Sequence, residues 1–282
     1  MIFKTCGNKE NKTIVLLHGG GLSWWSNQEI IEFLEKYYYI VAVVIDGHGE
    51  DADKTFINIE NSSEQLINYI VNELNEKVYA LIGLSLGGQI IIEAISQRNN
   101  ITEYAIVESA LVCPMKYVGV ISPVMIKSSY GLIKKKWFSI IQAKELCLPK
   151  NKWDLYFEDS VKISKQSLIN ISKSNSNYEL KESISQTKTK VLIIIGEKEM
   201  TKIKQSAEKL NKKLTNSKIL IAKKMKHGEL SLSYTKTYIE IINSFLKDEY
   251  KDIIKEHERK TPPQTAYLRY EHLCFIWGLV TL

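Results

Sequence analysis

The feature that most constrains the fold of this 282-residue chain is the short stretch Gly83-Leu84-Ser85-Leu86-Gly87. An apolar run from Val78 to Ile82 precedes it and has the length of a buried strand, while residues 89–98 repeat Ile and Ala at helical spacing. A strand that turns directly into a helix crowds the backbone at the central residue, so the neighbours of that residue must lack side chains. The two glycines provide that room. The pattern therefore predicts a sharp turn that pushes Ser85 out at the carboxyl end of a strand, in front of a helix N-terminus.

Other apolar runs of strand length alternate with helical patterns along the chain. They are residues 13–17, 39–45, 104–107, 191–195 and 218–222. Strands that are apolar on both faces and alternate with helices specify a mostly parallel sheet covered by helices on two sides. The sequence thus predicts an α/β fold.

The alternation stops between about Cys113 and Lys188, where helical patterns continue without a strand. So long an excursion indicates a helical subdomain rather than a loop. We therefore expect residues 1–112 and 189–258 to form the core and residues 113–188 to form a helical lid. Residues 259–282 differ in composition and form a tail of unknown role, which could dock on the core or mediate association.

Composition narrows the possible partners and location. The formal charge of +6 comes from lysines scattered along the chain, and runs such as Lys134-Lys135-Lys136 are too short to indicate nucleic-acid binding. No apolar run is long enough to span a membrane, and no secretory signal is visible. The four cysteines show no metal-ligand spacing and are typical of free thiols in a reducing compartment. These features predict a cytoplasmic protein.

A serine nucleophile needs a base, an acid that orients the base, and donors for the oxyanion. His227 follows the last apolar run and is the candidate base, and Glu199 follows the run before it. Glu108 also ends a strand pattern and is the alternative acid. The loop His18-Gly19-Gly20-Gly21 and the residue after Ser85 are candidate sources of backbone N–H donors.

These motifs resemble the α/β-hydrolase superfamily in its lid-bearing esterase and lipase-like branch, over roughly residues 12–248. The resemblance implies a catalytic triad of Ser85, Glu199 and His227. It also implies an oxyanion hole formed by the amides of Gly20 and Leu86, with Gly21 as the neighbour of Gly20. Two departures stand out: the acid is Glu where Asp is commoner, and only twelve residues precede the first core strand.

The resemblance implies a serine hydrolase that cleaves a small to medium carboxylic ester through an acyl-enzyme, without a metal or an organic cofactor. The same triad could serve an acyltransferase, a lactonase, a thioesterase or a carbon–carbon hydrolase, and the insertion would decide among them. A non-catalytic small-ligand receptor and an interaction protein are alternatives from other classes. Four tryptophans are candidates for the substrate pocket: Trp24, Trp25, Trp137 and Trp153. The oligomeric state stays open.

Overall fold

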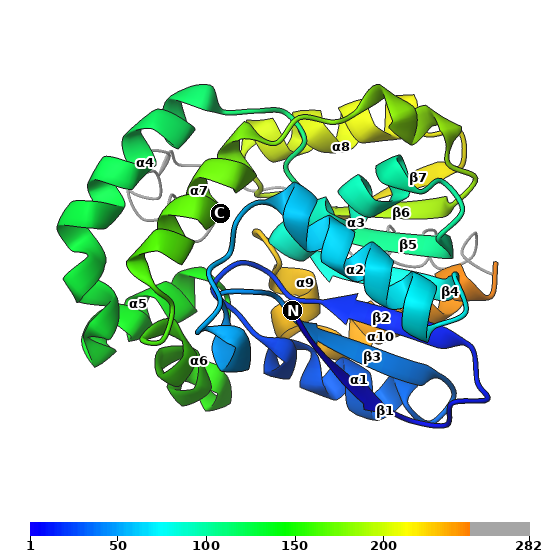
Figure 1. The fold of residues 1–282 in the computed structure, drawn as a ribbon, viewed down its shortest axis with the longest axis horizontal. Coiled ribbons are helices and arrows are strands. Elements are labelled where there is room, and N and C mark those ends of the chain that lie inside the picture. The colour runs from blue at the N-terminus through cyan, green and yellow to red at the C-terminus, as the bar shows by residue number, and fades with distance from the viewer. Residues whose placement is uncertain (249–282) are drawn as a thin grey trace.

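A seven-stranded sheet with helices on both faces forms the core of the protein (Figure 1). The computed structural model describes residues 1–248. The strands are β1 (Ile2–Cys6), β2 (Thr13–Leu17), β3 (Tyr39–Val44), β4 (Val78–Leu84), β5 (Thr102–Glu108), β6 (Lys190–Gly196) and β7 (Ser217–Ala222). Their order in the sheet is β1-β3-β2-β4-β5-β6-β7, and every neighbouring pair except β1 with β3 is parallel. The predicted α/β-hydrolase fold, with a mostly parallel sheet covered on two sides, is confirmed.

The strand β1 was not expected from the sequence. It pairs antiparallel with β3, with Ile2 opposite Val44 and Cys6 opposite Ile40. None of its residues is fully buried, because an edge strand has a neighbour on one side only. The segment therefore lacks the continuous apolar run that marks the buried strands.

Two apolar layers hold the helices to the sheet. Successive residues of β3 point to opposite layers: Val41 and Val43 belong to one, and Ile40 and Ala42 belong to the other. The first layer includes side chains of α2 (Ile59–Glu73), α3 (Leu86–Gln97) and α8 (Thr201–Lys213). The second includes side chains of α1 (Gln28–Leu34), α9 (Glu229–Ser233) and α10 (Thr235–Leu246). This two-sided burial explains why the central strands are apolar throughout.

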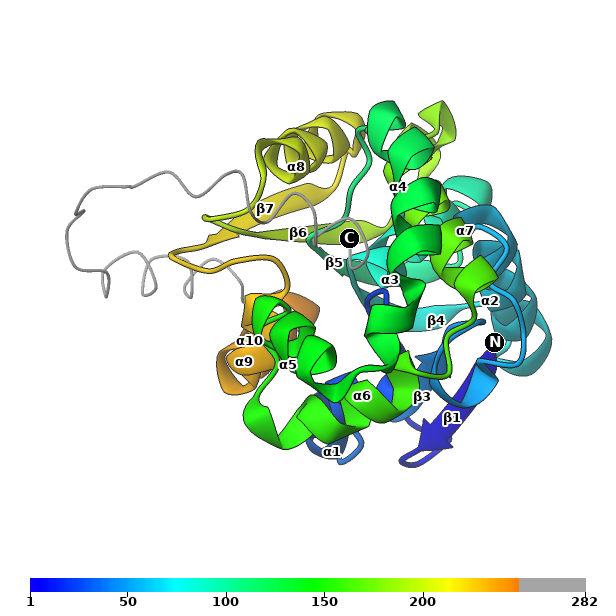
Figure 2. The same ribbon diagram turned by 90° about the vertical axis from the view of Figure 1, so that its left-hand side faces the viewer.

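Between β5 and β6 the chain is helical, as Figure 2 shows from the side of this insertion. The insertion holds α4 (Lys116–Ser129), η3 (Tyr130–Lys134), α5 (Lys136–Glu145), η4 (Lys150–Lys152), α6 (Trp153–Ser160), α7 (Lys165–Asn177) and η5 (Glu182–Gln186). Two further short 3-10 helices, η1 (Trp24–Asn27) and η2 (Gly49–Asp51), follow β2 and β3. A role of residues 113–188 as a lid stays a prediction.

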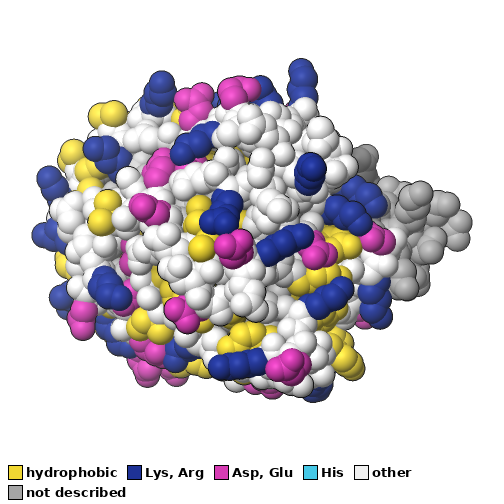
Figure 3. All heavy atoms as spheres, turned by 45° about the vertical axis from the view of Figure 1, so that its right-hand side comes forward, with side chains coloured by type: hydrophobic (Ala, Val, Ile, Leu, Met, Phe, Trp, Pro, Cys, Tyr) yellow, Lys and Arg dark blue, Asp and Glu magenta, His cyan; other side chains and the backbone are white. Residues whose placement is uncertain are grey.

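On the face in Figure 3, lysine and arginine side chains are interspersed with aspartate and glutamate. Within residues 1–248, no helix combines the length and the apolar character needed to cross a bilayer. The predicted tail, residues 259–282, lies outside the described residues.

Candidate active site

The turn between β4 and α3 holds Ser85 in a rare backbone conformation. Its φ is 50° and its ψ is −112°, and the side chain is buried at the first turn of α3. A Cβ added at Gly83 would lie 2.7 Å from the carbonyl carbon of Gly87. One added at Gly87 would lie 2.7 Å from the carbonyl oxygen of Leu17, at the end of the neighbouring strand. Both glycines are therefore required by close backbone approach, as the sequence pattern predicts.

Four parallel neighbours deliver the candidate side chains to one edge of the sheet. Ser85 follows β4, Glu108 ends β5, Glu199 lies three residues after β6, and His227 lies five residues after β7. Since the strands are adjacent and parallel, their carboxyl ends meet at the same edge.

His227 and Glu199 form a direct hydrogen-bonded pair. The Nδ1–H group of His227 donates to Oε2 of Glu199 at 2.9 Å. The Glu199 side chain is 1% exposed and that of His227 is 24% exposed. The opposite ring nitrogen, Nε2, is buried and has no hydrogen-bond partner in the described part of the chain. The pair thus leaves on His227 one nitrogen that can accept a proton.

Ser109 holds the second oxygen of Glu199, a role that the sequence reasoning missed. Its hydroxyl donates to Oε1 of Glu199, which also accepts the N–H of Gly196 at 3.4 Å. The Ser109 oxygen in turn accepts the N–H of Gly228, the residue after His227, at 3.2 Å. Ser109 therefore connects Glu199 to the loop that carries His227. The sequence signal that could have identified Ser109 was its position directly after Glu108, at the same edge of the sheet.

The charges of the pair shift both pKa values. Burial alone would raise the pKa of Glu199, but the charge of His227 and the hydrogen bonds from His227 and Ser109 outweigh it and hold the pKa below its usual value. Burial alone would lower the pKa of His227, but the Glu199 carboxylate outweighs it and raises that pKa. The site therefore stabilises an imidazolium next to a carboxylate.

Contacts beneath the site join the serine turn to the histidine loop. The N–H of Ser85 donates to the carbonyl of Glu108 at 2.8 Å. A Cβ added at Gly228 would lie 3.0 Å from the side chain of Leu84. The residues adjacent to Ser85 and to His227 thus pack against each other.

Glu108 lies apart from the His227–Glu199 hydrogen bond. Its side chain is 2% exposed, and Oε1 accepts the N–H of Ser231 in α9 at 3.4 Å. Its Oε2 has no partner among residues 1–248. Burial raises the pKa of Glu108 to about 7, against the opposing effect of the Ser231 hydrogen bonds. The geometry favours Glu199 over Glu108 as the acid that orients the histidine.

The glycine loop after β2 lies against the start of α3. A Cβ added at Gly20 would lie 3.9 Å from the Cβ of Leu86, and Gly21 has a φ of +74°. His18 anchors this loop, because its Nε2 accepts the N–H of Ile45 at 3.0 Å. Burial lowers the pKa of His18 to about 3, so its ring is neutral and structural. The loop thus brings the Gly20 backbone close to that of Leu86.

An apolar cluster lies beside the serine turn, between the core and the insertion. It consists of Leu22, Trp25, Leu84, Ala143, Leu146, Leu148, Tyr156 and Leu232, with Trp24 and Trp153 packed against it. Trp25 is buried and its Nε1–H donates to Asp159 of α6 at 2.7 Å. Tyr156 lies over the glycine loop, since a Cβ added at Gly21 would come within 4.0 Å of its hydroxyl. The cluster gives Ser85 an apolar neighbourhood.

Two of the four candidate tryptophans have contacts outside the apolar cluster. The Nε1–H of Trp24 donates to Glu50 at 3.3 Å, and Lys4 lies over its ring. The side chain of Trp137 is 58% exposed and meets Phe138 edge-on. Pocket roles for all four tryptophans stay predictions: Trp25 is buried, Trp24 and Trp153 are half-buried, and Trp137 is exposed.

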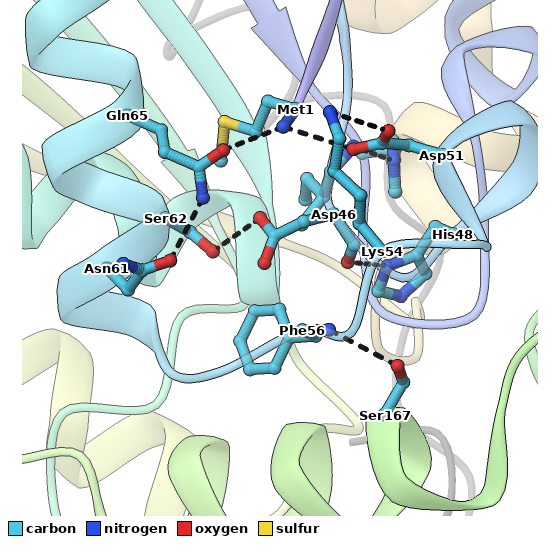
Figure 4. A network of polar contacts seen from close by, with 12 residues as sticks. Met1, Asp46, His48, Asp51, Lys54, Phe56, Asn61, Ser62, Gln65 and Ser167 are labelled. Atoms are coloured by element: carbon cyan, nitrogen blue, oxygen red, sulfur yellow. Dashed lines mark hydrogen bonds and ion pairs between the residues drawn. The ribbon is translucent and has the colours of Figure 1, made fainter.

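The loop after β3 is fixed by a network of polar contacts, shown in Figure 4. Oδ1 of Asp46 accepts the hydroxyl of Ser62 at 2.8 Å, and the ring of His48 donates to the Asp46 carbonyl at 3.1 Å. The N–H of Phe56 donates to Ser167 of α7 at 3.2 Å, which ties the loop to the insertion. Asp46 and His48 are therefore structural in this site.

Comparisons with known proteins bear on the family and the fold of the chain. The model of the alpha/beta hydrolase family matches residues 14–157, just over half of the chain. The uncharacterized hydrolase YugF of Bacillus subtilis is 28% identical over 137 residues, which span 47% of this chain and 49% of that protein. The chain thus aligns with about half the length of this curated relative.

Solved structures share the fold at low sequence identity. The esterase EaEST from Exiguobacterium antarcticum has a TM-score of 0.73 and 18% identity, and the match covers 87% of this chain and 94% of that one. MenH from S. aureus has a TM-score of 0.70 and 19% identity, with coverage of 88% and 98%. The TM-scores show a common fold, and at these identities the likeness shows the fold alone.

Proposed function

The chain belongs to the alpha/beta hydrolase family, and on this basis we propose that it is a serine hydrolase cleaving small to medium carboxylic esters. The observation that carries the proposal is the hydrogen-bonded His227–Glu199 pair, whose buried Nε2 is left without a partner among the described residues. Ser85 follows β4 at the same edge of the sheet and is the proposed nucleophile.

The proposed reaction passes through an acyl-enzyme. Nε2 of His227 takes the proton of Ser85 as Oγ attacks the ester carbonyl, and Glu199 stabilises the resulting imidazolium. The amides of Gly20 and Leu86 bind the oxyanion, at about 3 kcal/mol per donor. The C–O bond then breaks and the alcohol leaves with the proton from His227. Water, deprotonated by the same nitrogen, attacks the acyl carbon and releases the acid and Ser85.

An uncharged ester of modest size suits the surroundings of the serine. The adjoining cluster is apolar and includes Trp25 and Tyr156, both buried. Such a lining stabilises an acyl chain and excludes water from the oxyanion. A structural neighbour named as an esterase lends further support to this substrate class. We place the activity in the cytoplasm, on a small-molecule substrate.

The same triad could transfer the acyl group to an alcohol, or cleave a lactone, a thioester or a carbon–carbon bond. Product analysis with an ester, a thioester and a lactone of matched acyl length separates these reactions. A non-catalytic receptor would bind such esters without turnover.

The direct test is a pre-steady-state assay of the purified full chain with p-nitrophenyl butyrate. An acyl-enzyme route predicts a burst of nitrophenol whose size approaches one equivalent of enzyme when deacylation is slower than acylation. If neither a burst nor steady turnover appears across a series of short esters, the esterase proposal fails.

The apolar cluster should control acyl length. Trp153→Ala opens the side of the cluster formed by the insertion, so the preferred p-nitrophenyl ester should shift toward longer chains while the rate on acetate changes by less than about threefold. Trp137→Ala is the matched comparison and should shift the preference less, because its side chain is 58% exposed. A uniform loss of kcat/KM across the series in Trp153→Ala would make that residue a packing residue only.

The pH profile should report the charge environment of His227. His227 acts as a base only when neutral, and its raised pKa places the midpoint of the acidic limb of kcat/KM above the ordinary histidine value of about 6.5. The Glu108 carboxylate contributes to that raised pKa, so Glu108→Gln should move the midpoint to lower pH. A movement to higher pH would contradict this reading of the electrostatics.

A further inference from the structure

The outer face of α4 is apolar and open to solvent. Tyr117, Val120, Ile121 and Val124 are 52%, 74%, 51% and 69% exposed. Their spacing of three and four residues places them on one side of the helix. Large aliphatic side chains gathered on one exposed helix face mark a surface that meets another apolar phase.

This stripe is additional to the face by which α4 joins the protein. The opposite side of the helix buries Val118, Ser122 and Ile126, where α4 packs along α7. The helix is thus attached to the insertion through one side and presents a second apolar side outward. Figure 2 shows α4 on the side of the insertion that faces the viewer.

The helix α4 and the two elements packed against it, α7 and η3, carry charges of a single sign. From Ser109 to Lys144 the sequence contains no aspartate or glutamate, and neither does α7. Exposed lysines stand at both ends of α4 and on its neighbours; they are Lys116, Lys127, Lys134, Lys135, Lys165 and Lys173. The basic region ends at α5, where Lys136 pairs with Asp154 of α6 at 2.8 Å.

We propose that α4 and its flanking lysines bind the surface of an anionic phospholipid bilayer. The helix would lie in the plane of the interface, with Val120, Ile121 and Val124 among the acyl chains and the lysines at the phosphate groups. The ammonium groups of the lysines would reach the headgroups while their methylene stems lie along the apolar layer.

The charge pattern favours a bilayer over a second copy of this chain. In a two-fold symmetric dimer through α4, the same patch would meet itself, and lysines would face lysines without a carboxylate between them. An anionic bilayer supplies the opposite charge for each lysine and an apolar layer for the stripe. The proposal is independent of the esterase activity, because none of these residues belongs to the proposed triad.

Flotation of the purified full chain with lipid vesicles tests this surface. Binding to phosphatidylcholine vesicles containing phosphatidylglycerol should be at least tenfold stronger than binding to pure phosphatidylcholine, and should weaken as salt is added. The double variant Lys116→Gln with Lys127→Gln should lower the partition coefficient by about twenty-five-fold, at about fivefold per lysine.

The apolar contribution is tested by Val120→Glu with Val124→Glu, which should abolish flotation. Ile221→Glu on β7 is the matched control, since its side chain is 56% exposed on another element and should leave binding unchanged. Circular dichroism and thermal melting confirm that each variant is folded, and Ser85→Ala should bind vesicles like the unmodified chain. Equal binding to neutral and anionic vesicles, or no binding together with a concentration-dependent dimer, would overturn the proposal.

Discussion

Ser85→Ala is expected to lower kcat for a short p-nitrophenyl ester by a factor of about 10⁴ to 10⁶. The serine supplies the attacking oxygen, and without it the His227–Glu199 pair has no nucleophile to activate. The turn itself should persist, because close approach of the flanking glycines determines it and alanine has no added bulk. Steady-state kinetics with the purified variant, at concentrations high enough to detect residual turnover, measure this loss.

Ser128→Ala is the matched control for that experiment. Ser128 is exposed on α4, and its hydroxyl donates to the carbonyl of Met125 at 2.9 Å. Its replacement should leave kcat within about twofold. A Ser85→Ala variant that keeps more than about a tenth of the activity would remove Ser85 from the mechanism.

Glu199→Gln should lower kcat by a factor of about 10⁴, whereas Glu108→Gln should stay within about tenfold. Glu199 accepts the Nδ1–H of His227 at 2.9 Å and fixes the tautomer in which Nε2 can accept a proton. An amide in its place can present N–H to the ring and favour the wrong tautomer. Glu108 accepts a hydrogen bond from Ser231 instead and influences His227 through its charge alone.

The kcat values of Glu199→Gln and Glu108→Gln are compared only if both variants are folded. Both variants are first checked by thermal melting, because both carboxylates are buried. Greater loss in Glu108→Gln than in Glu199→Gln would reassign the acid to Glu108 while leaving Ser85 and His227 in their roles.

The periodicity of the sequence was sufficient to predict the strands of the central sheet. The strands β2 to β6 are largely buried on both faces, so each is a short apolar run that ends at a glycine or a polar residue. The edge strand β7 is partly exposed, but residues 219–222 are still an apolar run. The edge strand β1 escaped this reasoning because Ile2, Phe3 and Lys4 are only partly buried and read as an ordinary terminus. Strand order and register also depend on tertiary packing, which one sequence does not display.

The candidate site was predictable wherever a residue sits in a strand-end motif. Ser85, Glu199 and His227 follow β4, β6 and β7 and were found for that reason. Ser109 was missed because its role arises from β5 lying beside β6, where its hydroxyl reaches Glu199. The sequence did not separate the adjacent tryptophans: the Nε1–H of Trp25 donates to Asp159 of the insertion, while that of Trp24 donates to Glu50.

Labelling by a fluorophosphonate, followed by peptide mapping in a mass spectrometer, tests the central claim most directly. The reagent reports a serine activated by a neighbouring base and needs no knowledge of the natural substrate. The geometry predicts a single modified peptide, labelled at Ser85, with labelling lost in Ser85→Ala and slowed in Glu199→Gln. Labelling at a different serine, or an unmodified Ser85 in a folded and homogeneous sample, would contradict the assignment of this site.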